Sequence, residues 1–324
     1  MGKERGRDLQ INIRSRGEAL MSITSIITVN FHQAEVTIDL LKSVAKSYSP
    51  TQVEVIIVDN GAEKNRELIF QPYFGNIKYI QSKDNLGFAG GNNLGIKQAK
   101  GDYIFLLNND TEIPAGCVET MIAELEANDK IGLLSPLLLY FDQKELVQYA
   151  GFTPMNYLLA RNAYIGQFEK NTGQFNNKSY QTGFCHGAAV MCRKADLEKA
   201  GLMDETYFLY YEELDWCEKF KVIGKEIWFT GKTHVYHKES ISVGKASGLK
   251  IYFNTRNRML FIRKNTGWLN TILFSIYFTL IACPKAVLKY LIAGESNLAK
   301  WTLKGLWWNY THAKNSKDLG YEIK

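Results

Sequence analysis

The feature that most constrains the fold is a short apolar run, Tyr103–Leu107, that ends abruptly in Asn108, Asn109 and Asp110. A run this short, preceded by Gly101, is typical of a central strand that is buried on both faces. In an open parallel sheet, ligands bind at the carboxyl ends of the strands. The polar triplet therefore indicates either a turn or a site for a divalent cation that bridges a diphosphate.

The remainder of the chain up to about residue 240 alternates between strand and helix patterns. Strands alternating with helices of 10–15 residues predict βαβ units and an α/β fold around a mostly parallel sheet. In the first part we predict strands over 23–29, 53–58, 77–80 and 103–107, and helices over 34–48, 63–70 and from the loop 85–93 to about residue 100. In the second part we predict helices over 115–128, 195–200 and 214–222, strands over 131–140, 186–193, 227–229 and 234–237, and an irregular, mobile surface over 141–180.

Composition narrows the class of protein. A chain of 324 residues with 46% hydrophobic residues can bury a full core and is not disordered. Its five cysteines are odd in number and form no CxxC pair, which fits a reducing compartment and neither a disulfide framework nor a zinc site. Residues 1–20 lack the apolar core of a secretory signal, and we expect residues 1–21 to form a loose extension.

Polar residues follow two further predicted strands. Thr28 and Asn30 end the first strand, and Asp59 and Asn60 end the second. Because the carboxyl ends of parallel strands meet at one edge, three such ends predict a nucleoside site. Asp59 would accept a hydrogen bond from a pyrimidine N3–H or from ribose hydroxyls, or it would instead cap the helix expected at Glu63.

The loop Asp84–Asn93 is rich in glycine but does not follow the spacing of a dinucleotide-binding motif. It also follows the third strand rather than the first, so a Rossmann dinucleotide site is not expected. A glycine-rich turn that enters a helix still presents backbone N–H groups to an anion. We therefore expect this loop to line a sugar diphosphate through Asn85, Gly87, Gly90 and Asn92.

Carboxylates and a histidine later in the chain are candidates for catalysis. Glu212, Glu213 and Asp215 lie between aromatic residues just before a helix. They could stabilise the helix N-terminus, or one of them, held against apolar walls that raise its pKa, could act as a general base. His237 is either a structural residue or a metal ligand beside Asp110.

Eight segments, in this order, resemble the large inverting family of GT-A glycosyltransferases, and most of all bacterial rhamnosyltransferases and galactofuranosyltransferases. The segments are TVNF, VIIVDNG, DNLGFAGGNN, LLNND, GAAVMCRK, YYEELDW, HVYHK and YFNTRNRMLFIRKN, within residues 22–265. The resemblance implies a GT-A domain over 22–265, with a nucleotide-sugar half at 22–112 and an acceptor and catalytic half at 113–265. It also implies a nucleotide-sugar donor, a divalent metal (Mn²⁺ or Mg²⁺) and inversion at the anomeric carbon.

The resemblance assigns roles to residues at matching positions. Thr28, Asn30 and Asp59 match positions that contact the nucleoside, and His237 matches a histidine that some members use as a metal ligand. The triplet Asn108, Asn109 and Asp110 replaces the usual DxD, and its aspartate matches the one that binds metal. Glu213 stands where the family places its catalytic base, usually an aspartate, and Glu212 and Asp215 remain alternatives. Arg256 and Arg258 could bind the phosphates of the donor or form a basic helix face.

The last part of the chain is basic and aromatic. From Ile251 onward there are eleven Lys or Arg against three Asp or Glu, and four of the six tryptophans lie in residues 266–324. The apolar stretch 271–283 is interrupted at Pro284, which makes it shorter than the ~20 residues of a spanning helix. Farther on, Leu303, Leu306, Trp307 and Tyr310 form one apolar stripe with Lys300 and Lys304 nearby.

This pattern predicts an amphipathic helical tail on a membrane surface. Core packing or dimerisation, or a true spanning helix, are the alternatives, and the apolar content argues against nucleic acid as a partner. We therefore expect a cytoplasmic enzyme, peripheral on the inner face of the cell membrane, that glycosylates a lipid-linked or polysaccharide acceptor. L-Rhamnose from dTDP-rhamnose is the first candidate donor and UDP-galactofuranose or another UDP-hexose the second. A nucleotide-sugar-binding or glycan-binding protein without turnover is the rival from another class, and a nucleotidyltransferase is disfavoured because no triphosphate loop follows Val29.

Overall fold

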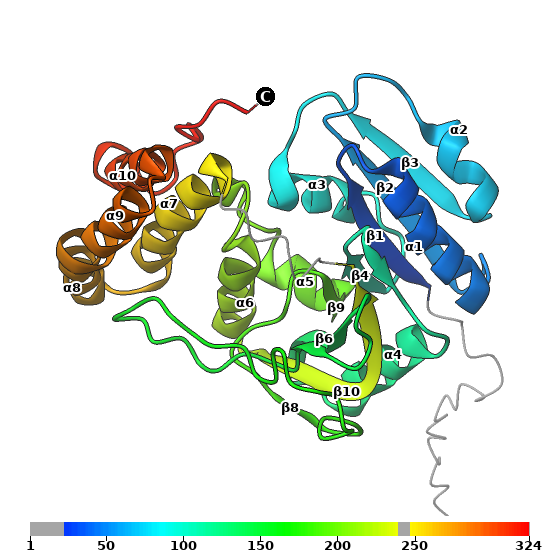
Figure 1. Ribbon diagram of the computed structural model, residues 1–324. Coiled ribbons are helices and arrows are strands. Elements are labelled where there is room, and N and C mark those ends of the chain that lie inside the picture. Colours follow the sequence, from blue (N-terminus) through cyan, green and yellow to red (C-terminus); the bar gives the residue numbers. More distant parts are fainter. Residues whose placement is uncertain (1–22, 239–246, 324) are drawn as a thin grey trace, which may run out of the picture.

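The computed structural model describes residues 23–238 and 247–323, so the extension expected at residues 1–21 lies outside the described part. The described chain is a single mixed sheet with helices on both faces, followed by a helical unit at its C-terminal end (Figure 1). The strands are β1 Thr24–Asn30, β2 Val53–Asn60, β3 Ile77–Ser82, β4 Tyr103–Leu107, β5 Thr111–Glu112, β6 Ile131–Tyr140, β7 Val147–Tyr149, β8 Ser179–Gln181, β9 Ala189–Arg193 and β10 Glu226–His237. The helices are α1 Ala34–Ser47, α2 Glu67–Phe70, α3 Gly87–Ile96, α4 Cys117–Ala127, α5 Lys194–Ala200, α6 Glu212–Val222, α7 Gly248–Asn265, α8 Trp268–Tyr277, α9 Cys283–Ile292 and α10 Ser296–Thr311.

The strand order places the polar strand ends beside one another. The sheet runs β3-β2-β1-β4-β9-β6-β10-β5, with β3, β2, β1 and β4 mutually parallel and β9 antiparallel to β4. The order reverses between β1 and β4, which is the point where open α/β sheets bind ligands. The predicted α/β class with a largely parallel sheet is confirmed.

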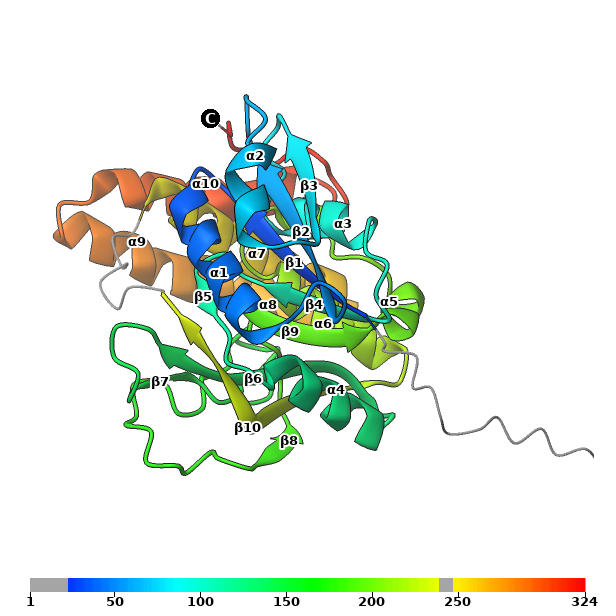
Figure 2. The ribbon, with the colours of Figure 1, turned by 90° about the vertical axis from the view of Figure 1, so that its right-hand side faces the viewer.

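Helices cover both faces of the parallel strands because the chain crosses over in opposite directions before and after the reversal. Helix α1 lies on one face and α3 on the other (Figures 1 and 2). Helix α3 approaches β1 and β2 closely, since a Cβ on Gly95 would lie 2.4 Å from Ile27 Cγ2. The glycines of this segment therefore serve helix–sheet packing, and any larger side chain at Gly95 would push α3 off the sheet.

Several predicted elements have different boundaries. The helix expected over 63–70 begins only at Glu67, and the two short strands expected at 227–229 and 234–237 are one continuous strand, β10. The segment 141–180 has little regular structure, as expected, but residues such as Tyr149 are fully buried in the core. All five cysteines are free and buried.

The helix expected to break at Pro284 continues through it. A π-helical segment, Phe278–Ala282, joins α8 to α9, and Pro284 occupies the first turn of α9, where its missing N–H is tolerated. Among the described residues, the 25-residue helix Trp268–Ile292 is the one that is long and apolar enough to cross a membrane, and only 17% of its most apolar window is buried. The argument that this run is too short to span is therefore wrong.

Candidate active site

Polar side chains at the ends of β1, β2 and β4 form a hydrogen-bonded chain along the rim of the sheet, as the sequence predicted. Asn109 Nδ2 donates to Thr37 Oγ1 (3.1 Å), and the Thr37 hydroxyl donates to Asn30 Oδ1 (2.9 Å). Asn30 Nδ2 in turn donates to Asp59 Oδ1 (2.7 Å). The Thr28 hydroxyl is buried and makes no hydrogen bond to any described residue. The rim is thus a pre-organised polar surface at the reversal of the strand order.

Asp59 is fully buried, and both of its oxygens are engaged. Its Oδ2 accepts from the Tyr79 hydroxyl (2.7 Å) and lies 3.1 Å from Arg66 Nε. Arg66, which is 22% exposed, therefore stands between Asp59 and solvent. Because α2 begins at Glu67, the alternative that Asp59 caps a helix at Glu63 is wrong.

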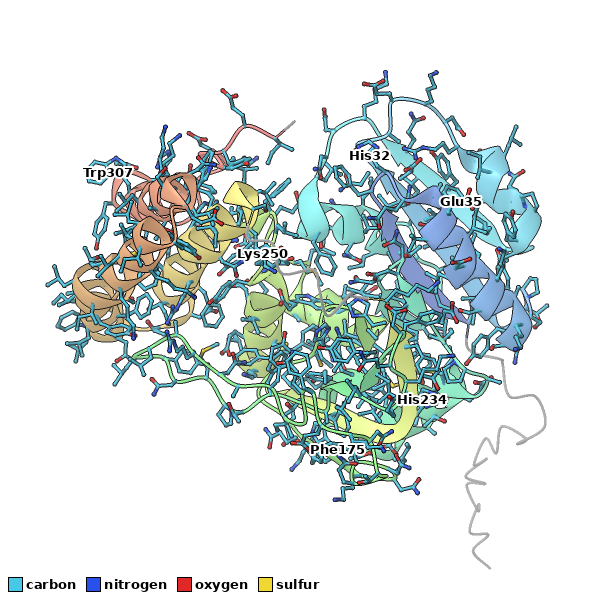
Figure 3. All side chains as sticks on the ribbon, viewed as in Figure 1. His32, Glu35, Phe175, His234, Lys250 and Trp307 are labelled. Carbon is cyan, nitrogen blue, oxygen red and sulfur yellow. The ribbon has the colours of Figure 1, made fainter. Side chains whose placement is uncertain are left out.

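A pocket of about 680 Å³ opens in front of Arg66, within the size range of small-molecule sites. Phe31, which is 43% exposed, and His32 line it just beyond β1 (His32 is labelled in Figure 3). Asn85 lines it from the glycine-rich loop, and Ile323 lines it from the C-terminal segment, which runs from α10 toward α3 in Figure 1. Ile323 could not be predicted from the sequence, because only the tertiary fold brings it to this pocket.

The glycine-rich loop is braced internally. The leading amides of α3 already donate within the protein, from Leu86 N to Asn60 Oδ1 (2.8 Å), from Gly87 N to Asn85 Oδ1 (3.0 Å) and from Phe88 N to the carbonyl of Phe208 (2.8 Å). The expectation that this helix N-terminus offers free amides to a diphosphate is therefore corrected.

The individual residues of the loop explain this bracing. Gly87 has φ +69°, and a Cβ on it would lie 2.1 Å from the carbonyl oxygen of Phe208, so only glycine fits. Gly90 lies within α3, and Asn92 is buried there with its amide donating to the carbonyl of Phe88 (2.9 Å). Of the predicted donor contacts in this loop, the structure leaves only Asn85 facing a pocket.

Asp110 and His237 come together from β4 and β10, which lie far apart in the sequence. His237 Nε2 lies 3.1 Å from Asp110 Oδ1, and that oxygen is buried without a hydrogen bond. Burial would raise the pKa of Asp110, but His237 and, more weakly, His186 hold it below its usual value. His237 Nδ1 lies 2.9 Å from Gln148 Oε1, a contact that fixes the orientation of the ring.

These two side chains fit a divalent cation. With Nδ1 donating to Gln148, a neutral His237 turns the lone pair of Nε2 toward the carboxylate of Asp110. In this tautomer the space between Nε2 and the carboxylate suits a cation, whereas in the other tautomer Nε2 carries a proton and donates it to Asp110 in a hydrogen bond. Nitrogen and carboxylate donors suit Mn²⁺, and adjacent ligands with bonds of ~2.1 Å lie about 3 Å apart, close to the spacing seen here.

His186 was missed as a site residue, although it begins the segment predicted as a strand. Its ring centroid lies 6.0 Å from that of His237, and its Nδ1 accepts from the amide of Ala188 (3.1 Å). Burial and the nearby His237 lower the pKa of His186 to about 3, so it is neutral. The antiparallel pairing of β9 with β4 brings it here, and that pairing is not visible in the sequence.

The candidate base Glu213 is the second residue of α6, which directly follows a strained loop. Phe208, Tyr210 and Tyr211 all have positive φ, at 64°, 69° and 75°, a conformation that is costly for aromatic residues. The side-chain amide of Asn257 on α7 donates to the carbonyls of Tyr207 (2.9 Å), Leu209 (2.8 Å) and Tyr210 (2.8 Å). Helix α7 therefore holds the loop in this conformation.

Arg256 belongs to the same clamp. It is fully buried and donates to the carbonyls of Thr206 (2.6 Å) and Tyr207 (3.4 Å), and its guanidinium stacks over Trp308 of α10 at 4.1 Å. Burial lowers its pKa to about 10. Because the guanidinium is fully buried and both Nη atoms donate within the protein, Arg256 presents no exposed donor to a diphosphate, which disfavours the predicted phosphate contact.

The three carboxylates of α6 have different environments. Glu212 is buried, its Oε2 makes no hydrogen bond to any described residue, and burial together with the charge of Glu213 raises its pKa well above the ordinary value. Burial also raises the pKa of the half-buried Glu213, and the backbone amides of Glu213 and Tyr211 oppose this only in part. Burial therefore favours the protonated form of both carboxyl groups compared with an exposed glutamate.

Asp215 is a structural acceptor. Its Oδ1 accepts from the Tyr207 hydroxyl (3.0 Å) and from Asn265 Nδ2 (2.8 Å), and thus ties α6 to the strained loop and to α7. Burial raises its pKa, while Asn265 and Lys219 oppose the shift. These contacts favour Glu213 over Asp215 as the base.

Glu213 lies beside the polar triplet that follows β4. A Cβ on Gly187 would lie 3.8 Å from Glu213 Cγ, so the two residues are in contact range. The next residue, Ala188, accepts a hydrogen bond from the amide of Asn108 (2.9 Å). The candidate base and the candidate metal ligands therefore lie on neighbouring segments. Arg258 does not join them, because it points to the carbonyl of Leu159 (2.6 Å) on the side of the tail.

Comparison with known proteins identifies the family of the chain. The profile of Glycosyl transferase family 2 matches residues 25–201. The low-salt glycan biosynthesis hexosyltransferase Agl10 of Haloferax volcanii is 24% identical over 75% of this chain and 76% of its own length. The N-acetylglucosaminyl-diphospho-decaprenol L-rhamnosyltransferase of Mycobacterium tuberculosis is 19% identical over 71% of this chain and 86% of its own.

Solved structures confirm the fold. TarS 1-349 of S. aureus superposes with a TM-score of 0.55 at 16% identity, over 88% of this chain and 80% of that one. GalNAc-T7 with UDP, GalNAc and Mn²⁺ gives a TM-score of 0.60 at 14% identity, over 74% of this chain and 48% of that one. The GT-A fold is thereby confirmed, and the chain belongs to Glycosyl transferase family 2.

Proposed function

We propose that this glycosyltransferase transfers L-rhamnose from dTDP-rhamnose to a lipid-linked or polysaccharide acceptor in cell-surface glycan synthesis. The observation that carries the proposal is the placement of Glu213 beside the segment that holds Asn108 and Asp110, at the reversal of the strand order. The choice of rhamnose draws on the mycobacterial L-rhamnosyltransferase among the relatives. UDP-galactofuranose or another UDP-hexose is the alternative donor.

The proposed reaction is a single displacement. The carboxylate of Glu213 takes the proton of an acceptor hydroxyl as the hydroxyl oxygen attacks the anomeric carbon. The bond from that carbon to the diphosphate oxygen breaks on the opposite face, so the nucleoside diphosphate leaves with the electron pair and the configuration inverts. A raised pKa suits Glu213 to act as a general base, because a general base is most effective when its pKa lies near the pH at which the enzyme works.

Asp110 and His237 are the proposed ligands of a divalent cation. Such an ion would supply positive charge to the departing diphosphate. Asn108 and Asn109 add amide donors at the same rim, and Asn109 is already oriented by Thr37 (3.1 Å). The amides replace charge that a second carboxylate would bring, so the site carries less negative charge against the diphosphate.

The 680 Å³ pocket is the proposed nucleoside site. The exposed ring of Phe31 offers a stacking surface for a base, and Arg66 offers a cation at the mouth. For Asp59 to accept from a base N–H, Arg66 must move from its position 3.1 Å away. The orphan hydroxyl of Thr28 has hydrogen-bonding capacity left for a ligand nearby.

We further propose that the tail holds the enzyme on the inner face of the cell membrane. Leu280, Ile281 and Leu288 are 70%, 59% and 58% exposed, and Trp307 is 66% exposed on the side of α10 away from the sheet (Figure 3). Within the helix Trp268–Ile292, the face that includes Phe274 is buried against the protein. A helix with one packed face and one exposed apolar face is better suited to lie in the membrane–water interface than to cross the membrane as an isolated transmembrane helix.

A thermal-shift panel tests the donor site. The full chain is heated with UDP, dTDP, GDP, CMP or NAD, each with and without Mn²⁺. Binding to the native state raises the melting temperature, because a ligand at a hundredfold excess over Kd increases the free energy of unfolding by ~2.7 kcal/mol. We expect a metal-dependent shift with dTDP or UDP that is lost in Asp110→Asn and kept in the exposed control Asp129→Asn. The proposal would be contradicted if only NAD shifted the melting temperature, or if none of the nucleotides did.

A further inference from the structure

A second cavity lies between the strained loop and the tail, away from the strand-end rim. It has a volume of about 240 Å³. Tyr211 and Arg258 line it on the catalytic side, Cys283 and Ala286 line it from the long apolar helix, and Thr302 lines it from α10. The cavity therefore lies between the loop that leads to Glu213 and the helix proposed to lie in the membrane.

Arg258 brings unused donors to this cavity. Its Nη2 donates to the carbonyl of Leu159 (2.6 Å) and its guanidinium lies 5.1 Å from the ring of Phe278, but its Nε is buried without a hydrogen-bond partner. Within residues 23–238 and 247–323 no carboxylate forms an ion pair with it. A partly desolvated guanidinium with a free N–H favours an anion.

The surroundings add positive charge and connect the cavity to the base. Burial raises the pKa of Tyr211, and the positive charges of Arg258 and Arg161 both oppose this rise. Glu213 acts on Tyr211 as well and follows it by two residues. An acceptor could thus place its hydroxyl at Glu213 and an anionic group at Arg258 in one bound pose.

We propose that this cavity binds the phosphate groups of a lipid-linked acceptor, whose hydrocarbon chain continues along the apolar helix Trp268–Ile292. The inference rests on the proposed glycosyl transfer and narrows its acceptor from a lipid-linked or polysaccharide molecule to a lipid phosphate. A neutral glycan would leave Arg258 unpaired, whereas a lipid phosphate matches both the guanidinium and the exposed apolar face beside it.

Direct binding tests the inference with three probes: farnesyl diphosphate, inorganic diphosphate and farnesol. Each is titrated into the full-length protein in EDTA, which removes metal-dependent binding at Asp110, and tryptophan fluorescence is followed. We expect farnesyl diphosphate to bind more tightly than either fragment. Equal affinity for inorganic diphosphate would overturn the lipid part, and equal affinity for farnesol would overturn the phosphate part.

Matched variants localise the site. Arg258→Gln should weaken farnesyl diphosphate binding by about tenfold to a hundredfold, and Arg258→Lys by less because the charge is kept. Ala286→Leu, which takes up part of the cavity while Arg258 is kept, should weaken it as well. The controls are Lys289→Gln, an equal loss of charge on α9, and Ala293→Leu, an equal gain of bulk at an exposed position. If the controls weaken binding as much as their partners, the cavity is not the site.

Failure of this inference is distinct from failure of the proposed function. Nucleotide binding with Mn²⁺ is measured on the same protein preparations without EDTA and reports on the strand-end site. Retained nucleotide binding without farnesyl diphosphate binding refutes the lipid-phosphate site alone. Loss of nucleotide binding in the wild-type protein refutes the donor site, whatever the lipid probe shows.

Discussion

Replacement of Glu213 by glutamine separates the candidate base from its neighbours. The amide has nearly the same shape as the carboxylate but cannot accept the proton of the acceptor. A positioned general base contributes roughly 10²- to 10⁴-fold to the rate, or about 3–5 kcal/mol of barrier. We therefore expect kcat to fall by at least a hundredfold with unchanged nucleotide affinity. Stability should not fall, because the lost carboxylate is one that burial already disfavours.

Asp215→Asn is the matched control, and its effect should have the opposite character. One oxygen of Asp215 accepts from both Tyr207 and Asn265, and an amide oxygen can keep both contacts, but the amide Nδ2 would replace Oδ2, which is buried and has no hydrogen-bond partner among the described residues. A buried donor left without a partner costs about 1–3 kcal/mol of folding free energy. We expect a lower melting temperature and a loss of kcat of less than about tenfold.

The assay follows release of the nucleoside diphosphate at saturating donor, together with melting curves and nucleotide titrations for each variant. Glu213→Asp, which keeps the charge on a shorter side chain, should retain partial activity. The assignment of the base is refuted if Asp215→Asn stays folded and loses as much rate as we expect of Glu213→Gln, while Glu213→Gln remains active.

Three further predictions address the rest of the site. Burial and the charge of Glu213 raise the pKa of Glu212 in the folded state, so the contribution of Glu212 to stability is full below about pH 4.5 and is lost as the pH rises. Glu212→Gln should therefore raise the melting temperature at pH 7.5 and leave it unchanged at pH 4. An equal change in melting temperature at both pH values would contradict this. His237→Ala should remove the Mn²⁺ dependence of nucleotide binding, and an unaltered Mn²⁺ titration would exclude His237 as a ligand. Ile323→Ser should weaken nucleotide binding severalfold while kcat at saturating donor stays the same, since Ile323 lines the pocket and is remote from the base; an effect on kcat alone would refute a donor-site role.

The strand-end rim could be predicted from the sequence because its logic is local. Each short apolar run predicts a buried strand, and the polar residues after it predict where the strand ends. The alternation of strands with helices predicts that neighbouring strands are parallel. Asn30, Asp59 and Asn109 are hydrogen-bonded along one edge for that reason. The contact of Asp110 with His237 was expected from a family resemblance, and the structure supplies the 3.1 Å geometry.

Other positions could not be predicted because their partners are set by tertiary packing. A charged side chain in a basic segment gives no sign that it is fully buried, as Arg256 is beneath Trp308. The glycines near Gly87 suggested an anion site, but closure of that loop against Phe208 uses the amides internally. Pro284 suggested a helix end, but a π-helical turn before it lets the helix continue.

Residues on the two sides of the boundary predicted at residue 265 contact one another. Trp308 on α10 stacks on Arg256, and Asn309 Nδ2 donates to the carbonyl of Arg256 (2.9 Å). Arg256 and Asn257 in turn hold the loop with three residues at positive φ that ends at the candidate base. The tail thus supports the catalytic loop as well as offering a surface to the membrane.

Two variants separate these two roles of the tail. A chain ending at residue 265 should lose transfer activity even in detergent, where no membrane is needed, because the clamp on the loop loses its backing. Exposed changes such as Leu280→Ser with Ile281→Ser should lower binding to anionic vesicles while activity in detergent stays intact. If the truncated chain in detergent retained full kcat, the support of the loop by α10 would be refuted, and the tail would be a membrane anchor alone.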